Sequence, residues 1–471
     1  MTKLLNPARV YGLRDRERAM LVKLIDVYEN ADSKNRLKER YYNGKITLGE
    51  VNLGIALPEG IRGLEIGCTW GAKTVDVLAS RSMFDGFVGE NGEDVDALAE
   101  IVQRNNLIAE YPKACRDELK IGCSFATLSA EPNRKCRIRF HSTSSAAAVW
   151  DGEKGRIAYG MAVIGTEPNR DGNGGWTANL IRLDTDKAVW MLRKDEHSDN
   201  WQAKAYPHKM GRPLMEPLIY NPTSGKPFGQ SRIKEPIRRL IQGYVRTIAN
   251  ATIGLEFSTA PQKYLLGVTD EQFDAVVNQK FRQYVGSIIT STVNPETGEK
   301  PSFGQLQQGS ITPHVEMLRI LATQFSAATG LTVTDTGVVN DANPTSSDAI
   351  LAQSQTLVLM AEQLNATNGD ALKNIALMAM AIENDTNIDG LDDTQKSIVA
   401  HFKNPAMPSV ALTADAAIKI ASARQGFADT DTFLEMIGFD QADIRRIKAQ
   451  ESRARGSRIL AEELTTDEAI S

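Results

Sequence analysis

The sequence predicts an α+β protein, because long amphipathic helices flank a middle region of short β-type runs. Its most regular stretch, residues 228–267, reads as a turn, a long helix with one apolar stripe, and an abrupt exit at Ala260-Pro261. No residue in this stretch resembles a nucleophile, an acid/base pair or a ligand set. A chain whose longest regular element holds no catalytic residue is expected to build a scaffold, so we interpret it as an assembly protein rather than an enzyme.

The composition is that of an ordinary globular chain with a slight acidic excess. Its 471 residues are 42% hydrophobic and carry a formal net charge of -5, which allows two or three domains and a sizeable core. Proteins that bind duplex DNA without sequence preference usually carry a basic surface. We therefore expect that this protein does not bind DNA phosphates over a broad surface. A mildly acidic lining would instead repel DNA and let it slide.

The cysteines and the hydropathy of the sequence indicate where in the cell the protein is expected. Four cysteines, Cys68, Cys115, Cys123 and Cys136, include no CxxC pair and fit no zinc spacing, so we expect small, reduced, buried residues. The first residues do not resemble a signal peptide, and no window reaches the roughly 18 apolar residues of a membrane span. We expect a protein without membrane contact, cytosolic or assembled into a particle there.

The N-terminal third is expected to be mainly helical. Apolar spacing predicts helices over residues 14–42, 70–81, 94–106 and 111–122, and a turn between short strands at residues 84–87.

The middle third is expected to consist of β-strands rather than helices. Its β-type runs are residues 125–128, 137–140, 157–164, 176–183 and 188–192. Turn clusters at Asp151-Gly152 and at residues 171–175 separate some of these runs, which together predict an antiparallel sheet.

The C-terminal half is again helical. A helix is expected from Thr312, whose hydroxyl would cap it, to Gly330, which would stop it. A loop over residues 331–345, rich in Thr, Val, Asp and Asn, follows. Ser346-Ser347-Asp348 then caps a helix to about residue 383, with an interruption at Asn368-Gly369 left open; unbroken, it would span roughly 54 Å. Further helices are expected over residues 415–424, 430–437 and 441–464.

One segment imitates a nucleotide site. Residues 67–74 (Gly-Cys-Thr-Trp-Gly-Ala-Lys-Thr) resemble a Walker phosphate loop, but that loop needs Gly directly before the lysine, where Ala72 stands. Together with Glu90 the segment also resembles part of an adenosylmethionine site. Thr69 replaces the central glycine of that site, however, and no alternation of strands and helices follows to build a parallel sheet. An enzyme that uses ATP or adenosylmethionine at residues 67–74 is therefore the alternative to a scaffold.

The other candidate sites are weak. The glycines of residues 172–175 fit a hairpin loop, and the charged run over residues 193–197 fits a solvated loop. The five histidines are scattered, so we expect no catalytic, cofactor or metal site. Six basic residues crowd the last helix: Arg445, Arg446, Lys448, Arg453, Arg455 and Arg458. A solvated face is the first interpretation of these residues, and contact with a partner or DNA is the second.

Several segments, in order, resemble the portal proteins of tailed bacteriophages, specifically the group typified by portals of long-tailed Bacillus phages. The segments are residues 75–87, 101–108, the helix ending in Gly122-Cys-Ser-Phe, 228–233 with its long helix, 260–267, 344–350, 414–419, 433–438 and 444–447. No single motif is strict, but the ordered series covers about residues 10–460. A different virion structural protein, such as a minor capsid or connector component, is a third interpretation.

The resemblance implies a phage portal fold with a mixed α/β wing, an α-helical stem, a small α/β clip and a helical C-terminal crown. By position, residues 1–229 would be the N-terminal part of the wing, 230–257 a stem helix, 258–310 the clip, 311–330 the second stem helix, 331–345 the tunnel loop, 346–400 the long wing helix, and 401–471 the crown.

The resemblance also implies a function. The chain would form a homo-oligomeric ring, usually a homododecamer, at one capsid vertex, through which double-stranded DNA is packaged and ejected. It would dock the terminase large subunit, which supplies the ATPase, and then the head-completion or adaptor protein. Major capsid and scaffolding proteins would be its other partners, in a virion assembled in the host cytoplasm.

The tunnel loop would face the DNA. Its polar candidates are Thr332, Thr334, Asp335, Thr336, Asn340, Asp341 and Asn343, and the loop holds no Lys or Arg. Such a lining cannot clamp phosphates by ion pairing, so it would touch DNA weakly and without reading its sequence. This property suits a conduit.

Overall fold

The computed structural model describes most of the chain in two compact units. The described residues are 4–46, 66–89, 96–168, 175–259, 263–266, 298, 300, 302–305, 310–338, 347–406, 410–424, 426–439, 443–444 and 446–456. The first unit comprises Met1–Lys38, Val75–Arg232 and Ser346–Ser471, and the second comprises Glu39–Thr74 and Ile233–Thr345.

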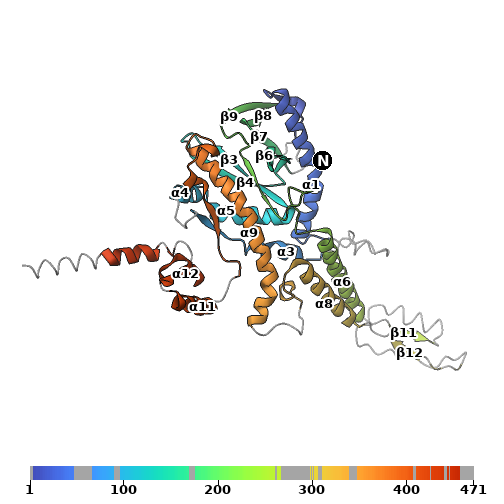
Figure 1. The fold of residues 1–471 in the computed structure, drawn as a ribbon. Helices are drawn as coiled ribbons and strands as arrows, with labels where there is room; N and C mark the ends of the chain where they lie inside the picture. Colours follow the sequence, from blue (N-terminus) through green and yellow to red (C-terminus); the bar gives the residue numbers. More distant parts are fainter. Residues whose placement is uncertain are drawn as a thin grey trace, which may run out of the picture. The chain divides into compact units, whose positions relative to one another are not determined.

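A six-stranded sheet forms one layer of the first unit (Figure 1). Its strands, in spatial order, are β1 (Val10–Tyr11), β9 (Trp201–Pro207), β8 (Ala188–Lys194), β7 (Trp176–Asp184), β6 (Arg156–Pro168) and β5 (Ala146–Asp151). All neighbours are antiparallel except β1 and β9. Leu21 and Leu24 of helix α1 (Asp15–Tyr42) are buried in one cluster with Met161 and Ile181 of the sheet. The antiparallel sheet predicted for the middle third is confirmed for residues 157–164, 176–183 and 188–192, whereas residues 125–128 and 137–140 lie in a separate sheet.

A second sheet, of three strands, packs against two helices and, through a buried cluster that includes Phe125 and Met215, against strands β5 and β6. Its order is β10 (Met215–Ile219), β3 (Cys123–Ala130) and β4 (Cys136–Ser142). Helices α5 (Leu107–Ile121) and α9 (Ser347–Glu383) both pack against it. Helix α9 runs without a break for 37 residues, through Asn368 and Gly369. The buried Asn368 side chain donates hydrogen bonds to the Tyr111 hydroxyl and the Glu118 carboxyl at 3.0 and 2.8 Å.

The turn predicted at residues 84–87 is wrong. Strand β2 (Phe84–Val88) continues through it and pairs with β13 (Val399–Phe402), which lies more than 300 residues away in sequence. Gly86 has a φ of +132° and sits beside an irregular register between His401 and Phe402. Its freedom at positive φ lets the strand bend rather than turn. Helices α3 (Trp70–Ala79) and α4 (Asp96–Arg104) confirm their predicted positions.

The remaining elements of the first unit are short. They are the 3-10 turns η1 (Pro7–Arg9), η4 (Ile388–Gly390) and η5 (Phe427–Asp429), and the helices α10 (Asp393–Lys396), α11 (Val410–Ala423) and α12 (Asp431–Met436). Residues 443–444 and 446–456 are also helical. The charged run over residues 193–197 is not wholly a loop, because Arg193 and Lys194 end strand β8. Strands β6 and β7 pair antiparallel, and residues 169–174, where most of the expected hairpin loop falls, lie outside the described residues.

The second unit contains a helix pair and a small hairpin. Helix α6 (Glu235–Thr259) begins five residues later than the predicted stem helix, and α8 (Thr312–Thr329) ends at Gly330, whose φ is +73°. Strands β11 (Lys263–Leu266) and β12 (Ser302–Gln305) pair antiparallel. The capping hydroxyl expected from Thr312 is wrong, because the N-cap residue is Ile311, which makes no side-chain cap; the Thr312 N–H donates to Ser310 Oγ at 3.2 Å.

Two further predictions concern the cysteines and membrane-spanning helices. All four cysteines are free and buried, as predicted. Within the part of the chain that the structure describes, no helix is long and apolar enough to cross a membrane.

Candidate functional site

The segment that the sequence predicted as a functional site follows helix α8, which packs against helix α6. Ile237, Ile241, Val245 and Ala249 bury one stripe of α6 at four-residue spacing, as expected of a helix packed on one side. Gly243 permits the close approach of α8, since a Cβ at this position would lie 3.1 Å from Leu321 Cδ2. The two helices therefore pack along a seam set by these side chains.

An aromatic cluster joins this pair to the start of α3. Trp70 is 1% exposed, and its ring centroid lies 4.6 Å from that of Tyr244 on α6 and 4.5 Å from that of Phe325 on α8. Its indole Nε1 donates a hydrogen bond of 3.0 Å to the Thr336 carbonyl oxygen. A buried indole N–H usually needs such a partner. Trp70 therefore ties the segment after α8 to the helix pair.

The segment after α8 is a closed turn rather than an open loop over its described part. Asp335 Oδ2 accepts hydrogen bonds from the Thr332 backbone N–H at 2.9 Å and from the Thr332 hydroxyl at 2.8 Å. The Thr336 hydroxyl donates to the Val333 carbonyl at 2.6 Å, and Gly337 ends the 3-10 turn η3 (Thr334–Thr336) at a φ of +74°. Local side-chain bonds of this kind stabilise turns.

The seven sequence-predicted site residues are placed unequally. Thr334 is exposed, Thr332 and Asp335 are half-buried, and Thr336 is buried. Four of the seven therefore come together in one turn, and of these the Thr336 side chain serves the turn itself. Asn340, Asp341 and Asn343 lie outside the described residues. Trp70, which positions the turn, was missed because its partner lies 266 residues away in sequence.

The segment that imitates a nucleotide loop has a structural explanation. A Cβ on Gly71 would lie 2.0 Å from the Tyr41 carbonyl oxygen, so this glycine serves the contact with the end of α1. The Thr74 hydroxyl, which would be needed for a metal-bound phosphate, is buried and donates to the Trp70 carbonyl at 2.8 Å. Cys68 and Trp70 are buried as well. The segment therefore fits a helix start packed into a core better than a phosphate cradle.

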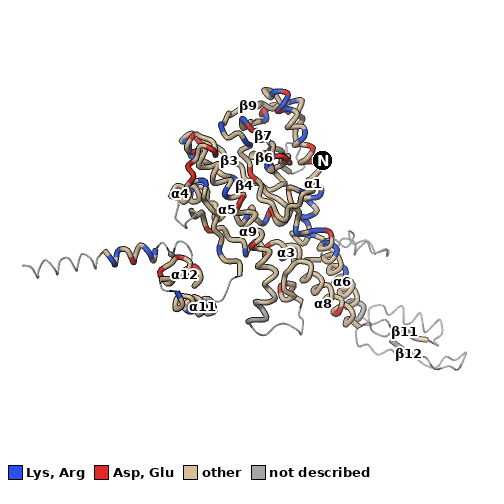
Figure 2. Tube along the Cα trace, in the orientation of Figure 1, with Lys and Arg blue, Asp and Glu red and all other residues tan. Residues whose placement is uncertain are grey.

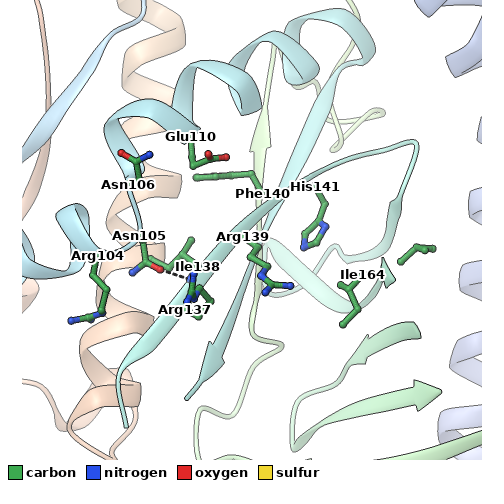
Figure 3. Close-up of a pocket in the computed structure, with 11 residues that line it drawn as sticks. Arg104, Asn105, Asn106, Glu110, Arg137, Ile138, Arg139, Phe140, His141 and Ile164 are labelled. Atoms are coloured by element: carbon green, nitrogen blue, oxygen red, sulfur yellow. Dashed lines mark hydrogen bonds between the residues drawn. The ribbon is translucent and has the colours of Figure 1, made fainter. Parts of the chain in front are cut away.

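A cleft of about 460 Å³ opens along strand β4 in the first unit (Figure 3). It is lined by Arg104, Asn105, Asn106, Glu110, Arg137, Ile138, Arg139, Phe140, His141, Val163 and Ile164. Asn105 holds the strand's outer edge, because its Oδ1 accepts from the Ile138 N–H at 2.8 Å and its Nδ2 donates to the Cys136 carbonyl at 3.1 Å. This amide thus takes the place of a neighbouring strand.

The chemistry of this cleft does not favour catalysis. His141 Nε2 lies 2.9 Å from the Thr127 hydroxyl, a distance that suits a nucleophile and its base. Thr127 is only 2% exposed, however, so no substrate reaches it. Burial, and then the charges of Arg182 and Arg139, lower the pKa of His141 to about 4. Among the described residues, no group of three or more His, Cys, Asp or Glu could hold a metal ion.

The site therefore combines a packed helix pair, a closed turn and a buried helix start. The sequence model described as "Phage portal protein, SPP1 Gp6-like" matches residues 6–457, and the chain therefore belongs to this family. The fold expected from the resemblance, a mixture of helices and sheets, agrees with the elements described above. Portal proteins of this family are structural components that connect the phage head to the tail.

Individual relatives are distant in sequence. The chain is 23% identical over 462 residues to the portal protein of Mycobacterium phage D29, which covers 95% of this chain and 91% of that one. Among solved structures, a chain in the virion of a native gene transfer agent particle has a TM-score of 0.46 and 10% identity over 79% of this chain and 89% of its own. A chain in the neck of the native particle, computed with C12 symmetry, has a TM-score of 0.46 and 11% identity over the same shares.

Proposed function

We propose that this chain forms a homo-oligomeric ring, a homododecamer, at one vertex of a phage capsid, and that double-stranded DNA passes through its axis. The observation that carries the proposal is the match of the portal family over residues 6–457, which includes the α6–α8 pair and the turn after it. The ring would receive the genome during packaging and release it during ejection.

The surface of α8 supports association between copies. Met317 and Ile320, three residues apart on α8, are 44% and 52% exposed in the isolated chain. Large apolar side chains gathered on one surface often mark a protein interface. In the proposed ring, a neighbouring copy covers them, so that the α6–α8 pairs stand side by side as the stem.

The composition of the turn after α8 supports passage of DNA without tight binding to the protein. Residues 331–345 hold no Lys or Arg, so the loop offers phosphates no ion pair. Among the described residues of this segment, Thr334 is exposed and Thr332 and Asp335 are half-buried, and Asp335 adds negative charge. We assign this segment as the tunnel loop, with Asn340, Asp341 and Asn343 completing its polar surface.

The other segments take the roles that the family suggests. Residues 1–229 and 346–400 would form the wing, 230–257 and 311–330 the stem, 258–310 the clip, and 401–471 the crown. The clip would dock the terminase large subunit and then the head-completion protein. Capsid and scaffolding proteins would surround the wing. The ATPase activity would belong to the terminase, and this chain would not be an enzyme.

Electron microscopy of the purified chain tests the proposal most directly. Negatively stained particles should be rings with a central hole, and native mass spectrometry should give the number of copies. If the chain is monomeric alone, the same images are recorded after co-expression with its scaffolding protein. A chain that stays monomeric in both preparations, or that binds ATP or adenosylmethionine with an affinity abolished by Lys73→Ala, would overturn the proposal.

A further inference from the structure

The cleft along strand β4 exposes part of a sheet edge. β4 is the last strand of its sheet, with β3 on its inner side. One end of the outer edge is covered, because Glu383 Oε1 accepts from the Cys136 N–H at 2.8 Å. Asn105 Oδ1 accepts from the Ile138 N–H, also at 2.8 Å. Outward main-chain groups recur at every second residue of an antiparallel edge strand. Phe140, two residues beyond Ile138, therefore turns its N–H and C=O outward, and it lines the cleft.

The described part of the chain leaves this position open. No described residue donates to or accepts from the Phe140 main chain on the outer side of β4. The cleft measures about 460 Å³ and reaches Val163 and Ile164 of β6, and sites that bind ligands commonly measure about 300–1,000 Å³. Figure 3 shows Phe140, Arg139 and Ile164 around this space. The space therefore suits a short extended peptide, whose main chain can pair with an open strand edge.

Two of the three arginines that line the cleft already have carboxylate partners. The Arg104 guanidinium contacts the Glu383 carboxylate, and Arg137 Nε lies 2.9 Å from Glu131 Oε1. Figure 2 marks the arginines of β4 in blue. Because Arg104 and Arg137 are paired within the chain, neither of them is assigned to a ligand.

Arg139 is the cation of the lining that a ligand can reach. It is exposed and has no ion pair among the described residues. His141, two residues on and thus on the same face of the strand, adds no charge near pH 7, because burial chiefly lowers its pKa to about 4. Glu110, the acidic residue of the lining, lies 2.6 Å from Lys113. A carboxylate placed beside Arg139 would therefore meet an uncompensated positive charge.

We propose that this cleft binds an extended acidic peptide of a partner protein, which adds as a further strand beside β4. The peptide main chain bonds to the N–H and C=O of Phe140. Its residue opposite Arg139 projects to the same face as Arg139, because directly opposed residues on neighbouring strands do so. An aspartate or glutamate at that position forms a charge-assisted pair with the guanidinium group. Such binding uses residues of the first unit alone and does not depend on ring formation.

Selection from random octapeptides by the full chain tests for this ligand. Wild type should enrich sequences rich in β-branched residues, with an acidic residue at one fixed position. Arg139→Gln should lose this acidic preference. Arg36→Gln, which removes an exposed arginine from α1, is the matched control and should select the same peptides as wild type. Absence of enrichment by wild type, or the same acidic preference in Arg139→Gln, would overturn the proposal.

The selected peptide is then synthesised with a fluorophore, and its binding to the full chain is measured by anisotropy. Arg139→Gln should weaken binding at least about tenfold, as expected for loss of a charged hydrogen bond, and Arg36→Gln should stay within about twofold of wild type. Circular dichroism checks that both variants are folded.

Two N-methylated forms of the peptide test the addition of a strand. Methyl groups on alternate nitrogens block one edge of an extended peptide and leave the other edge free. One form should therefore lose binding, and the form methylated on the opposite edge should keep it. Equal binding of both forms would exclude pairing with β4. Displacement of the peptide by oligothymidylate at equal charge would show that the cleft binds anions in general, and would overturn the assignment of a peptide.

Discussion

Gly71 and Tyr41 are in backbone contact: a Cβ at residue 71 would lie 2.0 Å from the Tyr41 carbonyl oxygen. The contact brings the start of α3 against the end of α1 within the second unit. Trp70, the neighbour of Gly71, packs on Tyr244 and Phe325 of the α6–α8 pair. A glycine that resembles part of a phosphate loop in sequence is therefore a packing residue in the structure.

Gly71→Ala should destabilise the protein through this contact. The new methyl group would meet a backbone oxygen, which cannot rotate away as a flexible side chain could, so we expect a loss of about 3 kcal/mol in the free energy of unfolding. Urea denaturation followed by Trp fluorescence measures it. Gly67→Ala is the matched control, because nothing lies within 4 Å of a Cβ there. Equal stability of the two variants would contradict the assignment of Gly71.

The helices were the most predictable part of this fold. Helices α1, α6, α8 and α9 lie where three- and four-residue apolar spacing predicted them, because this spacing is a local property of the sequence. Strands were missed where local signals oppose them. Strand β5 begins with three alanines, which are depleted in sheets, and β10 contains Pro217, which is tolerated because β10 is an edge strand.

Long-range contacts explain why the site was only partly predictable. The segment after α8 was predicted only as a loop rich in Thr, Val, Asp and Asn, although the bond from Thr332 to Asp335 that closes its turn spans only three positions. The contact from Trp70 to Thr336 could not be inferred from spacing. The edge of β4 is similar, because Asn105 reaches Ile138 across 33 residues. Nothing in the sequence around Asn105 distinguishes this amide from one that caps a helix.

Glu118 should make stability depend on pH. Its carboxyl group is fully buried, and burial raises its pKa to about 8, although the Asn368 amide opposes this shift. The folded protein thus keeps a proton that the unfolded chain loses above its ordinary pKa of 4.5. Glu118 should therefore stabilise the folded protein most below about pH 4.5. The free energy of unfolding should fall by on the order of a few kcal/mol between about pH 4.5 and about pH 8, and level off above that pH.

The variant Glu118→Gln should remove this pH dependence. Glutamine keeps an oxygen that can accept from Asn368, but it has no proton to lose. Urea midpoints at pH 6 and pH 9 should therefore differ less in the variant than in wild type. Glu153→Gln, at an exposed position, serves as the control and should keep the wild-type difference. If Glu118→Gln retains the full difference between the two pH values, other groups are responsible.

Ile320→Asp should disrupt association of copies while leaving each copy folded. Ile320 is 52% exposed, so a carboxylate there is solvated in the monomer, but in the proposed ring it would be buried against a neighbour. Each copy would lose about 1.5–3 kcal/mol of apolar burial in addition to the cost of the charge. Light scattering after gel filtration should show smaller species. Asn250→Asp, exposed on α6, adds the same group elsewhere and should assemble normally; assembly by both variants would exclude this surface.

Charge reversal in the tunnel loop should slow or stall DNA passage. In the proposed ring, Asp335→Lys would place an ammonium group beside the DNA phosphates, and it also removes the oxygen that accepts from the Thr332 N–H at 2.9 Å. Asp335→Asn separates these effects, because it keeps an acceptor oxygen and removes only the charge. Packaging by rings with their terminase should therefore be near wild type for Asp335→Asn and at least several-fold slower for Asp335→Lys. Asp341→Lys should behave as Asp335→Lys does. Normal packaging by both lysine variants, in rings of normal appearance, would show that this loop does not face the DNA.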